Sequence, residues 1–294
     1  MSAGAPLRTV EEQLGDVLAA VRPLPTARVA LAEATGATLR EPVRAALDIP
    51  VFDNSAMDGF AVRFADVAHA SPAAPVILRV VADLPAGTAD DPPLAAGEAA
   101  RIMTGSPVPS DADAIVPFED TAGGLSDSLQ TATVQRAPRS AGAFVRRAGD
   151  DLRSGDVVLE AGMMLGPLQV AAATAAGRTH AVVSARPRVA VVSTGSELAP
   201  AGTPLRRGQI PESNGVLLAG LAAAAGADVI AQVCVDDEGG ALRDAVAGLL
   251  AASVDAVIFS GGVSAGAFEV VRTELAAAMT FSRVAMQPGK PQGF

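Results

Sequence analysis

Two loops rich in glycine and small hydroxyl residues could hold an anion. The first is Ser193-Thr194-Gly195-Ser196-Glu197, and the second runs over residues 260–266. Each follows a short apolar run, and the backbone amides of such a loop, or of a helix start, accept phosphate or another oxyanion. Neither loop is a Walker A or GxGxxG motif, so nucleotide hydrolysis and dinucleotide binding have little support. Tight turns in an ordinary α/β domain are the alternative. The candidate ligand-binding residues are Ser193, Thr194, Gly195, Ser260, Gly261, Gly262, Ser264 and Gly266.

Four acidic side chains lie close to these loops in the sequence: Glu197, Asp236, Asp237 and Glu269. Carboxylates beside phosphate-type loops suggest a bridging divalent cation, and hard oxygen ligands favour Mg²⁺. Helix capping explains Asp237 and Glu269 equally well, because both sit near expected helix starts. The sequence predicts Glu197, Asp236 and Glu269 as metal ligands.

Lys290 is the only lysine of the chain, and it stands in Pro288-Gly289-Lys290-Pro291. Its ammonium is a compact charge suited to an oxyanion, although chance placement is an alternative. His69, His180 and Cys234 share no metal-ligand spacing, and Cys234 is expected to be a buried small hydrophobe. No Ser-His-Asp set can be assembled from the sequence.

The elements after residue 187 alternate between strand and helix. We expect strands at 188–193, 228–234, 256–260 and 284–286, and helices at 213–225, 239–252 and 269–278. This alternation is typical of a doubly wound parallel α/β sheet, which binds ligands outside the carboxyl ends of its strands. Both glycine-rich loops, the acids and Lys290 would then lie at one sheet edge.

The first half of the chain has a different pattern. Thr9 and Glu12 form a capping box ahead of an amphipathic helix at 9–22, and a second helix is expected at 28–34. Runs at 76–81, 114–118 and 131–135 separated by turn residues predict a small β module. A further helix is expected at 167–176. We therefore expect a discontinuous N-terminal α+β domain over 7–50 and 144–183, a β module inserted at 51–143, and an α/β domain at 184–294.

Composition narrows the function classes. The chain has 294 residues, is 50% hydrophobic, and carries 22 basic against 32 acidic residues for a net charge of −10. This excludes general disorder and opposes binding to nucleic acid or anionic membranes. One cysteine excludes a disulfide scaffold, and no leader or spanning segment is apparent. A cytoplasmic soluble protein is the simplest expectation.

Three motif segments, at residues 53–61, 101–107 and 146–151, strongly resemble the molybdopterin molybdotransferase family (MoeA-like, including the gephyrin E domain). The loops at 193–198, 260–266 and 288–291 match later motifs of that family in the same order. The resemblance implies insertion of molybdate into adenylylated molybdopterin with release of AMP, assisted by Mg²⁺. It also implies a homodimer whose cleft lies between the α/β domain of one protomer and the inserted module of the other, and transient contact with a molybdopterin adenylyltransferase.

The resemblance carries catalytic roles to Asp58, Thr104, Asp151, Glu197 and Asp236, phosphate binding to the 260–266 loop, and recruitment of molybdate to Lys290. Two features depart from the family. Glu269 and Arg272 stand where the family has aspartate and lysine, and the chain stops at Phe294 before the family's Gly-Leu-Pro-Gly-Asn-Pro loop and C-terminal β domain. We therefore expect a C-terminally truncated chain. The alternatives are a non-catalytic pterin-binding fragment, or an adenylyltransferase, which the motif at 53–61 disfavours.

Overall fold

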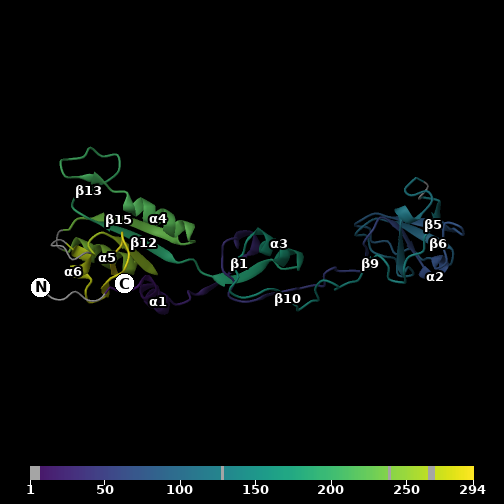
Figure 1. Cartoon of the computed structure of the whole chain (residues 1–294), viewed down its shortest axis with the longest axis horizontal. Helices are drawn as coiled ribbons and strands as arrows, with labels where there is room; N and C mark the ends of the chain where they lie inside the picture. Colours follow the sequence, from purple (N-terminus) through teal and green to yellow (C-terminus); the bar gives the residue numbers. More distant parts are fainter. Residues whose placement is uncertain (1–6, 127–128, 238–239, 264–268) are drawn as a thin grey trace. The chain divides into compact units, whose positions relative to one another are not determined.

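The chain forms two compact units, which Figure 1 shows within the whole chain. The computed structural model describes residues 7–126, 129–237, 240–263 and 269–294. The first unit contains residues 1–29, 34–40 and 182–294, and the second contains residues 30–33 and 41–181. The three-part division predicted from the sequence stays a prediction. No helix in the described ranges is long and apolar enough to cross a bilayer.

A parallel sheet with strand order β15-β12-β16 is the centre of the first unit. Its strands are β12 (Arg188–Thr194), β15 (Asp228–Val235) and β16 (Ala256–Ser260). The helices around it are α4 (Asn214–Ala224), α5 (Ala241–Ala251) and α6 (Val270–Glu274). β12 is buried along almost its whole length because it pairs on both edges and is covered on both faces. The predicted α/β architecture is confirmed.

The two faces of β12 pack against different helices. Ala190 and Val192 join the core formed with Leu242 of α5 and Val271 of α6. Ser193, on the opposite face, lies beside α4, which contacts β12 and β15 (Figure 1). Because β12 and β16 are parallel, their carboxyl ends lie at the same edge of the sheet.

The N-terminal helix begins as the sequence predicts. α1 (Val10–Ala20) has Thr9 as its N-cap, and the reciprocal bonds between Thr9 and Glu12 complete the capping box. Its apolar face is exposed, however, at Val10, Leu14 and Leu18.

Two predicted elements are wrong. Residues 28–34 do not form an α-helix: they contain the end of β1 (Thr26–Ala30) and a 3-10 turn, η1 (Leu31–Glu33), because β1 pairs with β11 (His180–Ser184). Residues 284–286 are not a fourth parallel strand. The Val284 amide instead donates to the Lys290 carbonyl (2.7 Å) beside the antiparallel pair β17 (Phe281–Arg283) and β18 (Pro291–Gly293), so the segment folds back on itself.

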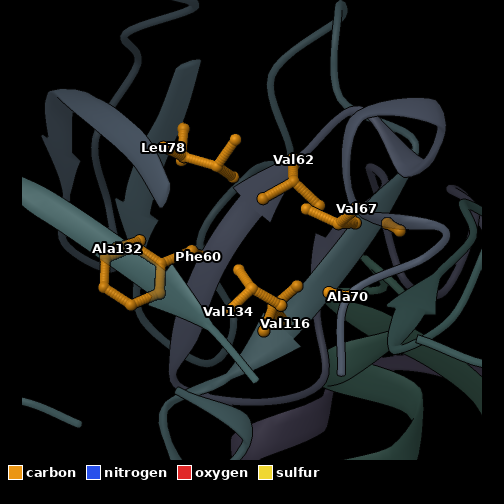
Figure 2. Close-up of a cluster of buried hydrophobic side chains, with 10 residues drawn as sticks. Phe60, Val62, Val67, Ala70, Leu78, Val116, Ala132 and Val134 are labelled. Atoms are coloured by element: carbon orange, nitrogen blue, oxygen red, sulfur yellow. The ribbon is translucent and has the colours of Figure 1, made fainter. Parts of the chain in front are cut away.

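The second unit contains a five-stranded sheet with order β7-β4-β6-β5-β8, in which only the β5–β6 pair is parallel. Its strands are β4 (Gly59–Val62), β5 (Val76–Leu84), β6 (Glu98–Ile102), β7 (Ala114–Pro117) and β8 (Thr131–Val134). All five strands contribute to one apolar core, in which Figure 2 shows Phe60, Leu78, Val116 and Val134 gathered together. The predicted β-rich character is confirmed.

The remaining elements are short. They are β2 (Val43–Arg44), β3 (Asn54–Ser55), α2 (Phe64–Val67), η2 (Phe118–Asp120), β9 (Val145–Arg146), β10 (Val157–Leu159), α3 (Pro167–Ala175), β13 (Leu198–Ala199) and β14 (Ile210–Pro211). α3 confirms the helix predicted there, and β3 pairs with β9 in antiparallel register.

Candidate functional site

A cavity of about 630 Å³ lies at the carboxyl ends of the parallel strands in the first unit. The loops after β12, β15 and β16 and the residue preceding α6 contribute to its wall. Its lining residues are Thr194, Gly195, Ser196, Glu197, Asp237, Gly261, Gly262 and Glu269. The structure thus brings both glycine-rich loops and three of the acids to one place, as the strand topology predicts.

The two glycines after β16 approach β12 more closely than any other residue could. A Cβ on Gly261 would lie 2.4 Å from the Thr194 carbonyl oxygen, and one on Gly262 would lie 2.9 Å from Thr194 Oγ1. Both glycines also have left-handed backbones, with φ of +94° and +63°. A side chain at either position would collide with β12, so this part of the cavity lining is glycine backbone, which can bind an oxyanion.

The hydroxyl of Thr194 is buried without a partner. Thr194 is 5% exposed, and its Oγ1 makes no hydrogen bond with any part of the chain that the structure describes. Buried hydroxyls are rarely left unpaired, because the loss of water bonds is costly. Because Thr194 lines the cavity, its unpartnered hydroxyl belongs to the candidate site.

Carboxylates stand on the same wall. Glu197 folds back over Gly195, where an added Cβ would lie 2.5 Å from Glu197 Oε2. Asp237 and Ser196 bond reciprocally: the Ser196 amide donates to Asp237 Oδ2 (3.1 Å), and the Asp237 amide donates to Ser196 Oγ (3.2 Å). Asp237 therefore fixes the loop after β12. Its Oδ2 is already engaged by the Ser196 amide, which leaves Oδ1 for a metal.

The predicted metal ligands do not all meet. Glu197 and Glu269 line the cavity, but Asp236 is exposed and is not one of its lining residues. Over the described ranges, no three acidic, histidine or cysteine side chains lie close enough together to hold a metal ion. Of the three predicted metal ligands, Glu197 and Glu269 therefore share the cavity in the described part of the chain.

Two predicted residues are already engaged by side chains that the sequence analysis missed. Ser193 is 1% exposed, and its hydroxyl donates to Glu212 Oε1 (2.9 Å), which also accepts from the Gly215 amide (2.6 Å). Asn214 Nδ2 donates to Ser260 Oγ (2.9 Å). The polar run at 212–214, where the apolar helix α4 begins, was the signal that could have revealed them.

Other predicted residues lie elsewhere. Lys290 lines a separate cavity of about 310 Å³ in the first unit, with Leu7, Val284 and Met286 among its neighbours. Ser264 and Gly266 lie outside the described residues.

Cys234 is exposed rather than buried as predicted, because its strand β15 is at an edge of the sheet. Partial burial, followed by the negative charges of Glu212, Glu197 and Asp236, raises the pKa of its thiol.

A second group of predicted residues belongs to the second unit. Asp58 lies in the bend between β3 and β4, and its Oδ1 accepts from both the Thr104 amide (2.6 Å) and the Thr104 hydroxyl (2.8 Å). These bonds, the backbone one first, hold the pKa of Asp58 below its ordinary value. The side chain is exposed, so an ionised carboxylate is presented to solvent. Asp151 is exposed too, and its amide donates to the Ile49 carbonyl (2.9 Å).

Comparisons with known proteins agree over nearly the whole chain. The family described as the MoeA N-terminal region (domain I and II) matches residues 8–177, and the probable molybdopterin binding domain matches residues 190–294. Molybdopterin molybdenumtransferase 2 of Mycobacterium tuberculosis is 44% identical over 98% of this chain, which covers 71% of that protein. Molybdopterin molybdenumtransferase 1 of the same species is 37% identical, with 98% and 70% covered.

Solved structures give the same result. The molybdopterin biosynthesis MoeA protein from Pyrococcus horikoshii superposes with a TM-score of 0.83 at 28% identity, over 98% of this chain and 72% of that one. The motifs, the two matched regions and the shared fold converge on one assignment: this chain belongs to the MoeA family of molybdopterin molybdenumtransferases.

Proposed function

We propose that this protein inserts molybdate into adenylylated molybdopterin and releases AMP. The observation that supports this most is the cavity at the carboxyl ends of β12 and β16, where two left-handed glycines and an unpartnered buried hydroxyl face the same space as carboxylates. Such a site suits a substrate with anionic oxygens, and the family supplies the identity of that substrate.

We assign separate binding roles to the backbone amides and to the carboxylates of the cavity. Backbone amides near Gly195, Gly261 and Gly262, with the Thr194 hydroxyl, would hold phosphate oxygens of the pterin substrate. Glu197 and Glu269 would orient the phosphoanhydride and any cation that accompanies it. Cleavage of a phosphoanhydride depends mainly on positioning and charge neutralisation, so no strong protein nucleophile is needed.

Mg²⁺ fits this site as an ion shared with the substrate. It commonly takes one or two protein carboxylates together with water and phosphate oxygens, which matches the two acids Glu197 and Glu269. When bound, it would neutralise charge that develops on the phosphate oxygens. Asp236 would act as a catalytic residue and metal ligand after a rearrangement of the loop that follows β15 brings it to the cavity.

Asp58, with Thr104 and Asp151, forms the second part of the proposal. Because Thr104 occupies Asp58 Oδ1 twice, Oδ2 is the oxygen left to contact substrate or metal. Lys290 would attract molybdate, since its ammonium is the one cationic group among the residues that line its cavity. Ser193 and Ser260 would act through Glu212 and Asn214 rather than through direct contact.

The test is AMP release from adenylylated molybdopterin in the presence of molybdate and Mg²⁺. We expect Glu197→Gln and Asp58→Asn each to reduce release at least about tenfold. Glu160→Gln, an exposed neutralisation outside both groups, is the matched control. Unchanged release in both site variants would refute the assigned roles. Pterin binding without AMP release by the unmutated chain would favour a non-catalytic binding protein.

We also propose a cytoplasmic homodimer that transiently contacts an adenylyltransferase. The family to which the chain belongs supports this proposal. If one active site takes residues from two protomers, mixing inactive Asp58→Asn with inactive Glu197→Gln should restore up to about a quarter of the activity. A monomer in light scattering, or no recovery on mixing, would refute the shared site.

A further inference from the structure

We propose that Asp53 is a positioning residue that joins the three motif segments of the second unit. These segments carry Asp58, Thr104 and Asp151, which the proposed function places in the reaction. Asp53 lies in the same motif segment as Asp58, but the sequence alone assigned it no role. Its backbone carbonyl links the 53–61 segment to the chain just after the 101–107 segment, and its carboxylate links it to the 146–151 segment.

The carboxylate bridges a gap in an antiparallel ribbon. Residues 49–55 run opposite residues 145–152, with Ile49 opposite Leu152 at one end and β3 paired with β9 at the other. The last backbone bond before the gap runs from the Gly149 amide to the Pro50 carbonyl (3.0 Å). Val51 and Phe52, inside the gap, are exposed.

Asp53 closes this gap with its side chain. Oδ1 accepts from the Ala148 amide (2.8 Å), and Oδ2 forms an ion pair with Arg147. The bond from Ala148 first, and then Arg147, hold the pKa of Asp53 below its ordinary value despite partial burial. The carboxylate therefore stays ionised at neutral pH, where both contacts persist.

The turn that the Asp53 carboxylate binds, through Ala148 and Arg147, leads directly to Asp151. The Arg147 amide donates to Asp150 Oδ2 (2.8 Å), and Gly149 has a left-handed backbone with φ of +75°. Without the Asp53 carboxylate, the Ala148 amide loses its acceptor and the Arg147 guanidinium loses its ion-pair partner. We expect the turn to keep its local bonds but to lose its attachment to the 53–58 segment.

The backbone of Asp53 makes the other link. Its carbonyl accepts from the Val108 amide (3.0 Å), just after the turn at 104–106. Ser55 exchanges bonds with that turn, accepting from Gly105 (2.8 Å) and donating to Ser106 (3.0 Å). That turn presents Thr104 to Asp58. Asp53 thus binds Val108, just after the Thr104 turn, through its carbonyl and the turn before Asp151 through its carboxylate.

The experiment combines amide hydrogen exchange with kinetics in Asp53→Ala and Asp53→Asn. Asn keeps an oxygen for Ala148 but loses the ion pair, so its effect should lie between wild type and Ala. The matched control is Asp91→Asn, which removes the charge of another turn-holding carboxylate: Asp91 accepts from the Ser110 amide (2.8 Å) and hydroxyl (2.7 Å).

We expect peptides covering 146–152 to exchange about fivefold to tenfold faster in Asp53→Ala, with wild-type exchange there in Asp91→Asn. AMP release should lose about tenfold in kcat with little change in KM, because reacting groups are misplaced while the binding cavity of the first unit is untouched. Partial recovery in Asp53→Asn would support positioning over a general loss of folding.

Unchanged exchange at 146–152 in Asp53→Ala would overturn the inference. Faster exchange with wild-type kcat would overturn the catalytic part of it. The kinetic readout rests on the proposed function, whereas exchange does not. If the unmutated chain releases no AMP, the proposed function fails, and exchange alone decides whether Asp53 holds the Asp151 turn.

Discussion

Gly261→Ala tests whether the wall of the cavity is as close-packed as described. The new Cβ would meet the Thr194 carbonyl oxygen at 2.4 Å, and φ is +94°, in a region where an L-residue is strained. Strain costs about 1–2 kcal/mol. Relief of the overlap, which must move β12 or the loop after β16, costs about 1–3 kcal/mol more. The expected loss of folding free energy is about 2–5 kcal/mol.

Gly226→Ala provides the control for strain alone. Gly226 lies in the same unit with φ of +91°, but a Cβ added to it would have no other atom within 4 Å. It should therefore cost only about 1–2 kcal/mol. The difference between the two variants, about 1–3 kcal/mol, isolates the contact with Thr194.

Thermal unfolding followed by circular dichroism at the helical band is a suitable assay, because α1, α4, α5 and α6 all belong to the first unit. At roughly 2–4 °C per kcal/mol, Gly261→Ala should melt about 2–12 °C below Gly226→Ala. Equal melting temperatures would show that the loop after β16 does not press against β12, and the cavity geometry would have to be abandoned.

Three further outcomes follow from local contacts. Thr104→Val removes one of two donors to Asp58 and should raise the pKa of that carboxyl toward its ordinary value. Ionised Asp58 contributes stability that is present above its unfolded pKa and is lost as pH falls through its folded pKa. In Thr104→Val this loss should begin at a higher pH. A carboxyl NMR titration that shows no shift in the pKa of Asp58 would contradict this. Thr9→Ala should cost about 1 kcal/mol and speed amide exchange in α1, and unchanged exchange would argue against the capping box. Cys234, whose pKa is raised, should react with iodoacetamide at pH 8 more slowly than free cysteine despite its exposure, and an equal rate would be inconsistent with that shift.

The sequence was most informative where chemistry and local geometry agree. The Thr9 and Glu12 pair predicts a capped helix, since its two bonds involve residues only three apart. Apolar strands alternating with helices predict a parallel sheet, whose topology brings Thr194 and Gly261 to one edge. Neither inference needs knowledge of distant contacts.

Predictions failed where a distant partner decides the outcome. The segment at 28–34 has helical spacing, but pairing of β1 with β11 makes it extended instead. Residues 284–286 look like a buried strand, yet their first amide bonds to Lys290 within a fold-back. Cys234 has a β-rich apolar context in the sequence, but only the strand order reveals that β15 is an edge.

The sequence predicted where the candidate site lies, but it did not predict which of its residues face the cavity. Ser193 and Thr194 are neighbours of the same type, and the sequence treats them alike. In the structure, alternation along β12 turns the Ser193 hydroxyl to Glu212, while the Thr194 hydroxyl stays unpaired within the described part of the chain. Which of two adjacent hydroxyls serves the ligand therefore depends on the far side of the sheet.

The unpaired hydroxyl also gives a physical reason for associating the cavity with binding. A buried donor without a partner costs about 1–3 kcal/mol, and an apolar residue of the same shape, such as valine, would avoid that cost. The fold nevertheless has threonine here, against two glycines whose backbones could not accommodate a side chain. Glycine is what stability requires at these two positions, whereas the unpaired hydroxyl lowers stability and needs another explanation. A ligand oxygen that accepts from Thr194 Oγ1 would remove the penalty. The hydroxyl that destabilises the free site would then favour its complex with an oxyanion.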